Sequence, residues 1–450
     1  MNILKFILTV LVVVLFSHPL LAQEVKPAAE AEPLSLTQAL SVALQNSPLL
    51  KASEQEVAMA LAKVGQARAQ LLPRIDVGTS FHRTTSPLMA FGDRLNQERV
   101  TTGDFDPRRL NDPAAISNFN TYLEITQPVY NGGKEWTGLN QSRLAHEAKQ
   151  REDRRTLDQL RFDVTQAYYG VILGREQLQV ARETLKTAEA HEAQARSLFR
   201  AGLVVESDVL SAEVRLAQVR EFLIAAENGL TLSRSALNTI MGVDEARAFR
   251  VTEALKFFEF KQDPEELKRR ALRSRADLEA LRVQVRVAEQ GVRLARSDYL
   301  PRLNLGGRYD LNEEHFLGTR GESWTGMVTL SINLFDGLGT SSRVEEARAG
   351  VLRVKALQER LEQGISLQVR QAHLDLLTAR GRIQASEKAV DQARESLRIT
   401  QNRYNSGLTT IVELLDGEVR LTEARMRTLQ ALYDYAVAKA KIDLAVGEEL

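Results

Sequence analysis

The sequence predicts a mainly α-helical fold made of two tandem copies of a long helical hairpin, with four β-strands between the helices. Two observations support this prediction. Residues 202–216 read GLVVESDVLSAEVRL and residues 407–421 read GLTTIVELLDGEVRL, so the same opening and the same close recur at an offset of 205 residues. Apolar residues also recur every 3.5 positions over very long stretches, which is typical of coiled-coil packing.

Further matches confirm that the chain is a tandem duplication. RAQLLPRIDVG (68–78) matches RSDYLPRLNLG (296–306) at an offset of 228 residues, whereas PVYNGGKEW (128–136) matches NLFDGLGTS (333–341) at an offset of 205. One loop of the first copy is therefore 23 residues longer, and we assign it to 82–117. The expected organisation is a signal peptide at 1–22, a first repeat at 23–242, an equatorial linker at 243–262 and a second repeat at 263–450.

The first residues have the pattern of a secretory signal peptide. Lys5 precedes an apolar run from Phe6 to Phe16, and Ala22 offers a cleavage point. A single membrane anchor is the alternative, but the run is short for a transmembrane helix. No apolar run of about 18 residues follows, so a mature chain that enters a membrane has to do so as a β-barrel.

Composition gives no support for a nucleic-acid-binding protein or for a metal-dependent enzyme. The 59 basic and 59 acidic residues balance, which gives no electrostatic signature of nucleic-acid binding. The chain has no Cys, so an exported form relies on packing without disulfides. The six His residues are not paired at metal-ligand spacing, and we expect no catalytic, metal or cofactor site.

The two longest helices are expected to pack closely. One heptad column carries large apolar residues and its partner column carries small ones, which allows neighbouring helices to approach each other. In the first copy these columns are Leu157, Val164, Val171, Leu178 and Leu185, with Leu160, Ala167, Gly174, Ala181 and Ala188. In the second copy the large column is Val369, Leu376, Ile383, Val390 and Leu397.

The helix lengths suggest a rod. Gly132 to Gly202 and Gly337 to Gly407 each span 70 residues, which is roughly 105 Å of helix and more than twice the thickness of a bilayer with its headgroups, ~40–45 Å. Half-length helices are expected to stack end to end along each long helix, at 35–72 with 203–241 and at 263–300 with 408–446.

Four segments alternate apolar and polar residues as strands do. They are 74–82, 119–127, 302–311 and 323–335. Strands of about 9–11 residues with one apolar and one polar face suit the wall of a membrane barrel, although a soluble sandwich also alternates. Because small barrels need about eight strands, four strands cannot close one, and several copies of the chain have to combine.

These motifs together resemble the TolC-like outer-membrane efflux proteins. The resemblance covers 35–450 and rests on LSLTQALSVALQNSPLLKA, the paired LLPR and YLPR, QPVYNGG, INLFDG and the two Gly-Leu turns. It implies a homotrimer in the outer membrane, with a twelve-stranded barrel and a twelve-helix tunnel that extends into the periplasm. It also implies the role of exit duct in a tripartite export system, without catalysis or cofactor.

The resemblance further implies a periplasmic adaptor and an inner-membrane pump as partners. The pump is of the proton-driven RND type, which exports small molecules such as drugs, or of the ABC type, which serves type I secretion of polypeptides. A soluble periplasmic coiled-coil scaffold or adaptor is the alternative function. The alternation of both strand pairs favours the duct.

Two groups of residues are expected at the end of the rod far from the strands. Gly202 and Gly407 are expected to reverse the chain, and the resemblance implies that the two turns dock the adaptor. The turn residues are Ala201, Gly202, Leu203, Val204, Val205, Ser406, Gly407, Leu408, Thr409 and Thr410.

The second group is a candidate constriction. Glu413 and Asp416 are three residues apart on one helix face, so threefold symmetry would form two carboxylate rings. The resemblance places them at the narrowest point of the tunnel; a solvated outer face is the alternative. We expect Asp208 and Tyr404 to hold the tip shut by hydrogen bonds. Some family members have Arg where this chain has Thr409, so a salt-bridged latch is not expected there.

Overall fold

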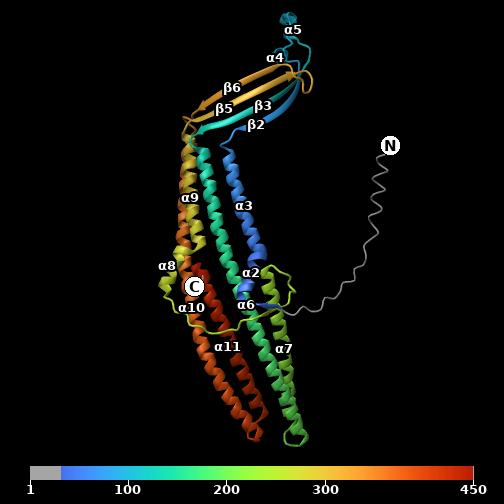
Figure 1. Cartoon of the computed structure of the whole chain (residues 1–450), viewed down its shortest axis with the longest axis vertical. Helices are drawn as coiled ribbons and strands as arrows, with labels where there is room; N and C mark the ends of the chain where they lie inside the picture. Colours follow the sequence, from blue (N-terminus) through green and yellow to red (C-terminus); the bar gives the residue numbers. More distant parts are fainter. Residues whose placement is uncertain (1–31, 449–450) are drawn as a thin grey trace, which may run out of the picture.

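The computed structural model describes residues 32–448 as a long rod of helices with a β-sheet at one end (Figure 1). The predicted signal peptide at 1–22 lies outside the described residues. The first repeat contains β1 (Glu32–Leu34), α2 (Leu36–Asn46), α3 (Pro48–Ala69), β2 (Arg74–Thr84), α4 (Pro87–Asn96), η1 (Thr102–Phe105), α5 (Pro107–Asn111), β3 (Ile116–Asn131), α6 (Lys134–Arg200) and α7 (Glu206–Met241). The rest contains β4 (Phe249–Val251), α8 (Pro264–Ser274), α9 (Ala276–Arg296), η2 (Ser297–Tyr299), β5 (Arg302–Glu313), β6 (Glu322–Ser331), α10 (Gly339–Asn405) and α11 (Ile411–Val446).

The two long helices match the prediction. Helices α6 and α10 have 67 residues each, which at 1.5 Å per residue is about 100 Å. Most residues of the expected heptad columns are buried, including Leu160, Val164, Val171, Ala181 and Ala188 in α6. Figure 1 shows α3 and α7 following one another along α6, and α9 and α11 following one another along α10.

The predicted half-length helices at 35–72 and 263–300 are each interrupted once. Ser47 has φ −54° and ψ 122° between α2 and α3, because a residue before proline avoids the α region and Pro48 follows. Arg275 is extended between α8 and α9. Each break lies against the C-terminal end of another helix. Gly242 follows α7, and a Cβ added to it would lie 2.6 Å from the Asn46 carbonyl oxygen. Gly447 follows α11, and a Cβ added to it would lie 3.2 Å from the Arg275 Cα.

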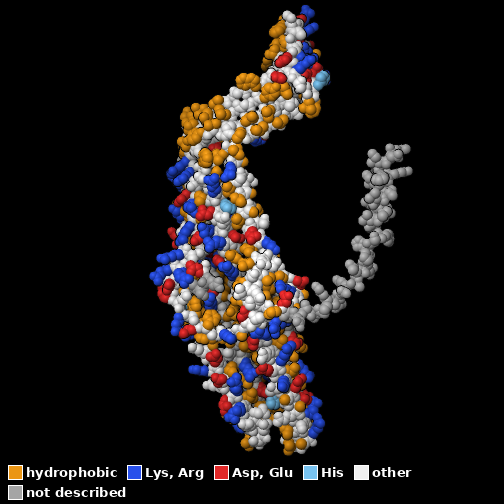
Figure 2. Space-filling view, in the orientation of Figure 1, with side chains coloured by type: hydrophobic (Ala, Val, Ile, Leu, Met, Phe, Trp, Pro, Cys, Tyr) orange, Lys and Arg blue, Asp and Glu red, His pale blue; other side chains and the backbone are white. Residues whose placement is uncertain are grey.

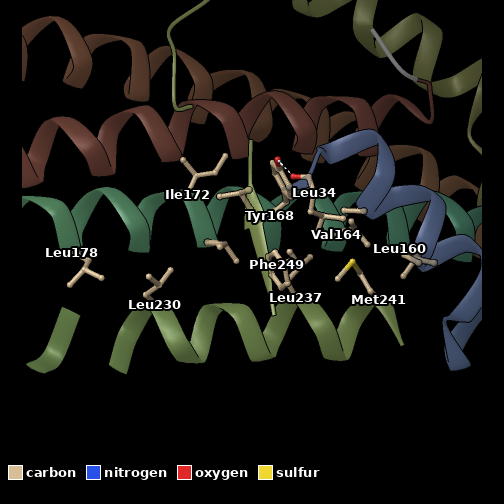
Figure 3. Close-up of a cluster of buried hydrophobic side chains, with 14 of the residues drawn as sticks. Leu34, Leu160, Val164, Tyr168, Ile172, Leu178, Leu230, Leu237, Met241 and Phe249 are labelled. Atoms are coloured by element: carbon tan, nitrogen blue, oxygen red, sulfur yellow. Dashed lines mark hydrogen bonds between the residues drawn. The ribbon is translucent and has the colours of Figure 1, made fainter. Parts of the chain in front are cut away.

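The middle of the rod holds the largest apolar core, which involves two strands that the sequence prediction missed. Strand β1 pairs in parallel with β4, which lies inside the predicted linker 243–262. Tyr168 of α6 is fully buried in this core and donates a hydrogen bond of 2.8 Å to the Leu34 carbonyl oxygen (Figure 3). The chain therefore has six described strands where four were predicted.

The remaining four strands form one antiparallel sheet in the order β2-β3-β5-β6. The sheet joins the two repeats, because β3 of the first pairs with β5 of the second. Strand β6 ends at Ser331, which pairs with Arg302 at the start of β5. Residues 332–335 were predicted as part of this strand but lie outside the sheet, because the partner strand β5 begins only at Arg302, directly after Pro301.

The long loop of the first repeat contains helices of its own. It was assigned to 82–117, but β2 extends to Thr84 and β3 begins at Ile116, and α4, η1 and α5 lie between them. Asp93 of α4 and Gln97, which directly follows this helix, are buried. In Figure 1 this segment lies beyond the outer end of the sheet.

Candidate functional site

The two tip turns have nearly the same backbone. Gly202 and Gly407 both have φ +72°, the left-handed conformation that favours glycine after a helix. The amides of Leu203 and Leu408 donate to the Leu198 and Arg403 carbonyl oxygens at 2.9 and 2.8 Å, which closes the last helical turn. The predicted turns at 201–205 and 406–410 are therefore compact reversals between α6 and α7 and between α10 and α11.

The tip turns leave apolar side chains in solvent. Leu203 and Leu408 are 71% and 69% exposed, and Val205 is 63% exposed. Behind these exposed residues the four helices share a small core, whose buried members are Ala195, Val209, Ala212, Tyr404, Ile411, Leu414 and Leu415. The two turns thus lie at the same end of the rod, and each leaves apolar side chains exposed.

Glu413 and Asp416 both lie at the tip and both are exposed. The Thr409 hydroxyl donates to the Glu413 carboxylate, and the Glu413 amide lies 3.4 Å from the Thr410 hydroxyl oxygen that caps α11. Asp416 lines a groove between α7 and α11, together with Leu210, Val214, Arg215 and Val412. The carboxylates are therefore available to solvent and to ions.

Tyr404 and Asp208 lie close enough to interact electrostatically. Tyr404 is buried in the tip core, and its hydroxyl has no hydrogen-bond partner within the described chain. Burial, and after it the negative charge of Asp208, raises the pKa of the Tyr404 hydroxyl. The hydrogen bonds that were expected to join neighbouring helices through Asp208 and Tyr404 and to hold the tip shut therefore stay a prediction.

The sheet at the other end has one apolar and one polar face. The apolar face is exposed and includes Ile75, Val77, Phe81, Leu123, Ile125, Leu305, Tyr309, Trp324, Val328 and Leu330. Figure 2 shows hydrophobic side chains gathered over the sheet, whereas charged side chains cover the helical rod. Exposed apolar surface of this extent marks a contact with another protein or with lipid.

The polar face carries a connected hydrogen-bond network. The Asn118 amide donates to Asn312 at 2.9 Å, and the Asn120 amide donates to Asp310 at 2.9 Å. The Arg308 guanidinium bonds Asp310 at 2.9 Å and lies 3.9 Å from the centre of the Tyr122 ring. This face is therefore suited to water.

One buried polar pair was missed by the sequence analysis. His191 of α6 and Glu418 of α11 approach to 2.6 Å, and their side chains are 9% and 6% exposed. The available signal was the Glu of the repeated EVRL motif, which is Glu213 in the first copy and Glu418 in the second. A single sequence does not reveal which partner that Glu takes.

Other site types are not supported by the described residues. Between residues 32 and 448, no three His, Asp or Glu side chains are grouped so as to hold a metal ion. None of the described helices is long and apolar enough to cross a bilayer.

Comparisons with known proteins agree with this arrangement. The model of the family described as "Outer membrane efflux protein" matches residues 39–243 and 267–448. Outer membrane protein TolC of Vibrio cholerae is 24% identical over 420 residues, which cover 92% of this chain and 90% of that protein. Alkaline protease secretion protein AprF of Pseudomonas aeruginosa is 25% identical over 430 residues, which cover 93% and 85%.

A solved structure shares the fold. The CmeC outer membrane channel of Campylobacter jejuni matches with a TM-score of 0.78 at 17% identity, over 92% of this chain and 85% of that chain. The family match spans most of both repeats, from α2 to the end of α11. The chain therefore belongs to the outer membrane efflux protein family.

Proposed function

We propose that three copies of this chain form the outer-membrane exit duct of a tripartite export system. The observation that carries the proposal is the combination of two ends in one molecule. At one end is an open sheet with an exposed apolar face, and at the other are helical hairpins whose long members measure about 100 Å. A soluble scaffold has no use for the apolar sheet face.

Ring closure follows from the direction of the strands. In the order β2-β3-β5-β6 every neighbour is antiparallel, so the outer strands β2 and β6 run in opposite directions. Strand β6 of one copy can therefore continue the antiparallel pattern with β2 of the next. Three copies give twelve strands, and a barrel wider than the eight-stranded type leaves a lumen. The polar network around Arg308 would face that lumen.

Helical packing supports the same ring. Apolar side chains remain exposed on α7, at Ile224 and Leu232, and on α10, at Leu352, Leu367 and Leu374. A head-to-tail contact between two different edges closes into a ring when the rotation suits. We assign these rows to contacts between copies, which would line up twelve helices around a tunnel.

The tip surface is where a periplasmic adaptor would dock. Leu203, Val205 and Leu408 form a small apolar patch on the outermost turns, and such exposed residues are typical of a contact made with a partner. An inner-membrane pump behind the adaptor would supply the energy. The carboxylates of Glu413 and Asp416, repeated three times, would form the constriction just inside.

The cargo follows from the pump. TolC-type and AprF-type relatives both match over nearly the whole chain, and AprF is named for the secretion of a protease. We propose that the duct accepts what its pump delivers, whether small molecules such as drugs or a polypeptide.

The test is photo-crosslinking from the tip in the native host. A benzophenone amino acid at Leu203 or Leu408 should capture one adaptor protein, whose genomic neighbour encodes an RND or an ABC pump. The same probe at Leu232, on α7 away from the tip, should capture a second copy of the chain. Capture of no adaptor from either tip position would remove the docking role.

A further inference from the structure

A cavity of about 350 Å³ lies in the middle of the rod, where the two repeats meet. Its walls come from α2 and α6 of the first repeat, from α11 of the second, and from the linker 243–262. On the α11 side, Ala436, Ala440 and Gly447 have little or no side chain, so this wall leaves space in front of α6. The volume is that of a site for a small molecule, about 300–1,000 Å³.

Aromatic side chains form much of the cavity wall. Phe162 and Tyr169 come from α6, and Phe258 comes from the linker. The Tyr435 hydroxyl donates to the Phe258 carbonyl oxygen at 2.6 Å, and the two rings lie 5.3 Å apart, which fixes this part of the linker. Phe258 remains 41% exposed, so a solute can reach the rings. Aromatic rings bury hydrocarbon and attract cations over their faces.

Asp158 of α6 brings a weakly compensated negative charge to this wall. Its side chain is 21% exposed, and within residues 32–448 its ion pair is with the half-exposed Arg161, at 4.0 Å. Burial raises the pKa of the Asp158 carboxyl and outweighs the opposing charges of Arg155 and Arg161. A further cation beside this carboxylate would therefore stabilise its ionised form.

The other charged groups of the wall have closer partners. Lys439 pairs with Asp443 at 2.7 Å, and Glu448 pairs with Arg270 at 2.5 Å. Asp158 is thus the carboxylate of this cavity that is most available to a ligand.

The duplication shows that this chemistry belongs to one copy. At the offset of 205 residues, Asp158 corresponds to Gln363 and Phe162 corresponds to Leu367. The second copy therefore has neither the charge nor the ring at these two positions. Packing of the long helix does not require them, because α10 has the same length without them.

We propose that this cavity binds a small organic cation with an apolar body. Asp158 would hold the positive group, and the hydrocarbon would pack among Phe162, Tyr169 and Phe258. A neutral molecule of the same shape would gain only the apolar contacts. The site lies within one protomer, so the inference goes beyond the export duct and does not depend on closure of a ring.

Ethidium is a suitable probe, because it is a fluorescent monocation with an apolar ring system. Titrated into the detergent-solubilised protein, with the same detergent as blank, it should give saturable binding at one site per chain. Asp158→Asn should raise the Kd at least tenfold, because the charged partner is lost. Asp163→Asn removes the same charge from α6 outside the cavity wall and should leave the Kd unchanged.

Two further variants separate the cavity from other sites. Ala440→Phe fills the cavity from α11 and should abolish binding of ethidium and of the neutral dye N-phenyl-1-naphthylamine, whereas Asp158→Asn should bind the neutral dye as the wild type does. E413A/D416A removes the carboxylates at the tip and should bind ethidium normally. If Ala440→Phe does not fold, the contrast between Asp158→Asn and Asp163→Asn decides alone.

Three results would overturn the site. They are a lack of saturable ethidium binding, an equal Kd for Asp158→Asn and Asp163→Asn, and loss of binding in E413A/D416A, which would assign the cation to the tip. Normal binding by a protein that forms no trimers would contradict the duct and would still support the cavity.

Discussion

Gly202 and Gly407 adopt the same left-handed conformation, with φ +72°, and each ends one of the two long helices. They stand 205 residues apart at matching positions of the duplication. A Cβ at either position would meet no atom within 4 Å, so the need for glycine comes from the backbone alone. This separates the geometry of the turn from any packing effect.

Gly407→Val should impair export while trimers remain in the membrane. A side chain in the left-handed region costs roughly 1–2 kcal/mol, and the strain is confined to the turn between α10 and α11. Gly350→Val is the control, because this glycine has the same open space inside α10 without a positive φ. Export and detergent-resistant trimers would be measured together; normal export by G407V would show that the turn tolerates another geometry.

Glu413→Ala/Asp416→Ala should weaken block by divalent cations and change conductance in planar bilayers. Both carboxylates are exposed at the tip, and a trimer concentrates six of them around one axis, where like charges attract cations. Removal of the same charge far from the tip, in Glu245→Ala/Glu266→Ala, should leave the block as it is. Equal block in both double variants would place Glu413 and Asp416 outside the bore.

Asp277→Ala should destabilise the middle of the rod. The Arg275 side chain is only 2% exposed and bonds the Asp277 carboxylate at 2.6 Å, and an unpaired buried charge costs about 3–5 kcal/mol. Asp375→Ala breaks an exposed pair with Lys441 and should cost about 1 kcal/mol or less. Urea unfolding of the detergent-solubilised protein, followed by circular dichroism, compares the two; similar midpoints would contradict the assigned role of Arg275.

The lowered pKa of the Asp277 carboxylate predicts that the folded protein loses stability in acid. Burial alone would raise the pKa of Asp277, but the hydrogen bond and the charge of Arg275, with the charge of Arg155, lower it below the ordinary value of 3.8. A lowered pKa in the folded state stabilises the fold above 3.8, and this contribution disappears as the pH falls through the lower folded value. Asp277→Asn should remove this part of the acid dependence.

The apolar face of the sheet predicts a contrast between neighbouring residues. Val328 belongs to the apolar face and Thr329 to the polar face of β6. Val328→Arg should cost up to about 2–4 kcal/mol if it lies deep in lipid and should lower the amount of trimer in the outer membrane. Thr329→Arg should be tolerated. Equal loss for both variants would mean that neither face meets lipid.

The long-range architecture was predictable because its signals are long. Heptad columns such as Val164 to Leu178 repeat often enough to fix the helix, and the duplicated turns fix its length. The interruption at Ser47 was also readable, from Pro48 after it, but a single proline near a helix start is easily taken for an ordinary first turn. Strands β1 and β4 have three residues each, too few to show alternation.

Contacts between segments far apart in the fold were beyond the sequence. Ile332 and Leu334 continue the alternation of β6, but the strand ends where its partner β5 begins, at Arg302. His191 and Glu418 are separated by 227 positions, and only the packing of α6 on α11 brings them together. The location of the two turns at the end of the rod was predictable, because each long helix ends at a glycine whose position in the sequence is known.

The central claim is that three sheets close edge to edge into one ring, and crosslinking between β2 and β6 tests it most directly. Ser80 on β2 and Thr329 on β6 both lie on the polar face. In S80C/T329C, made in this Cys-free chain, a flexible bismaleimide should yield covalent dimers and trimers and no larger species. Monomers alone, or ladders that continue past three copies, would contradict the ring.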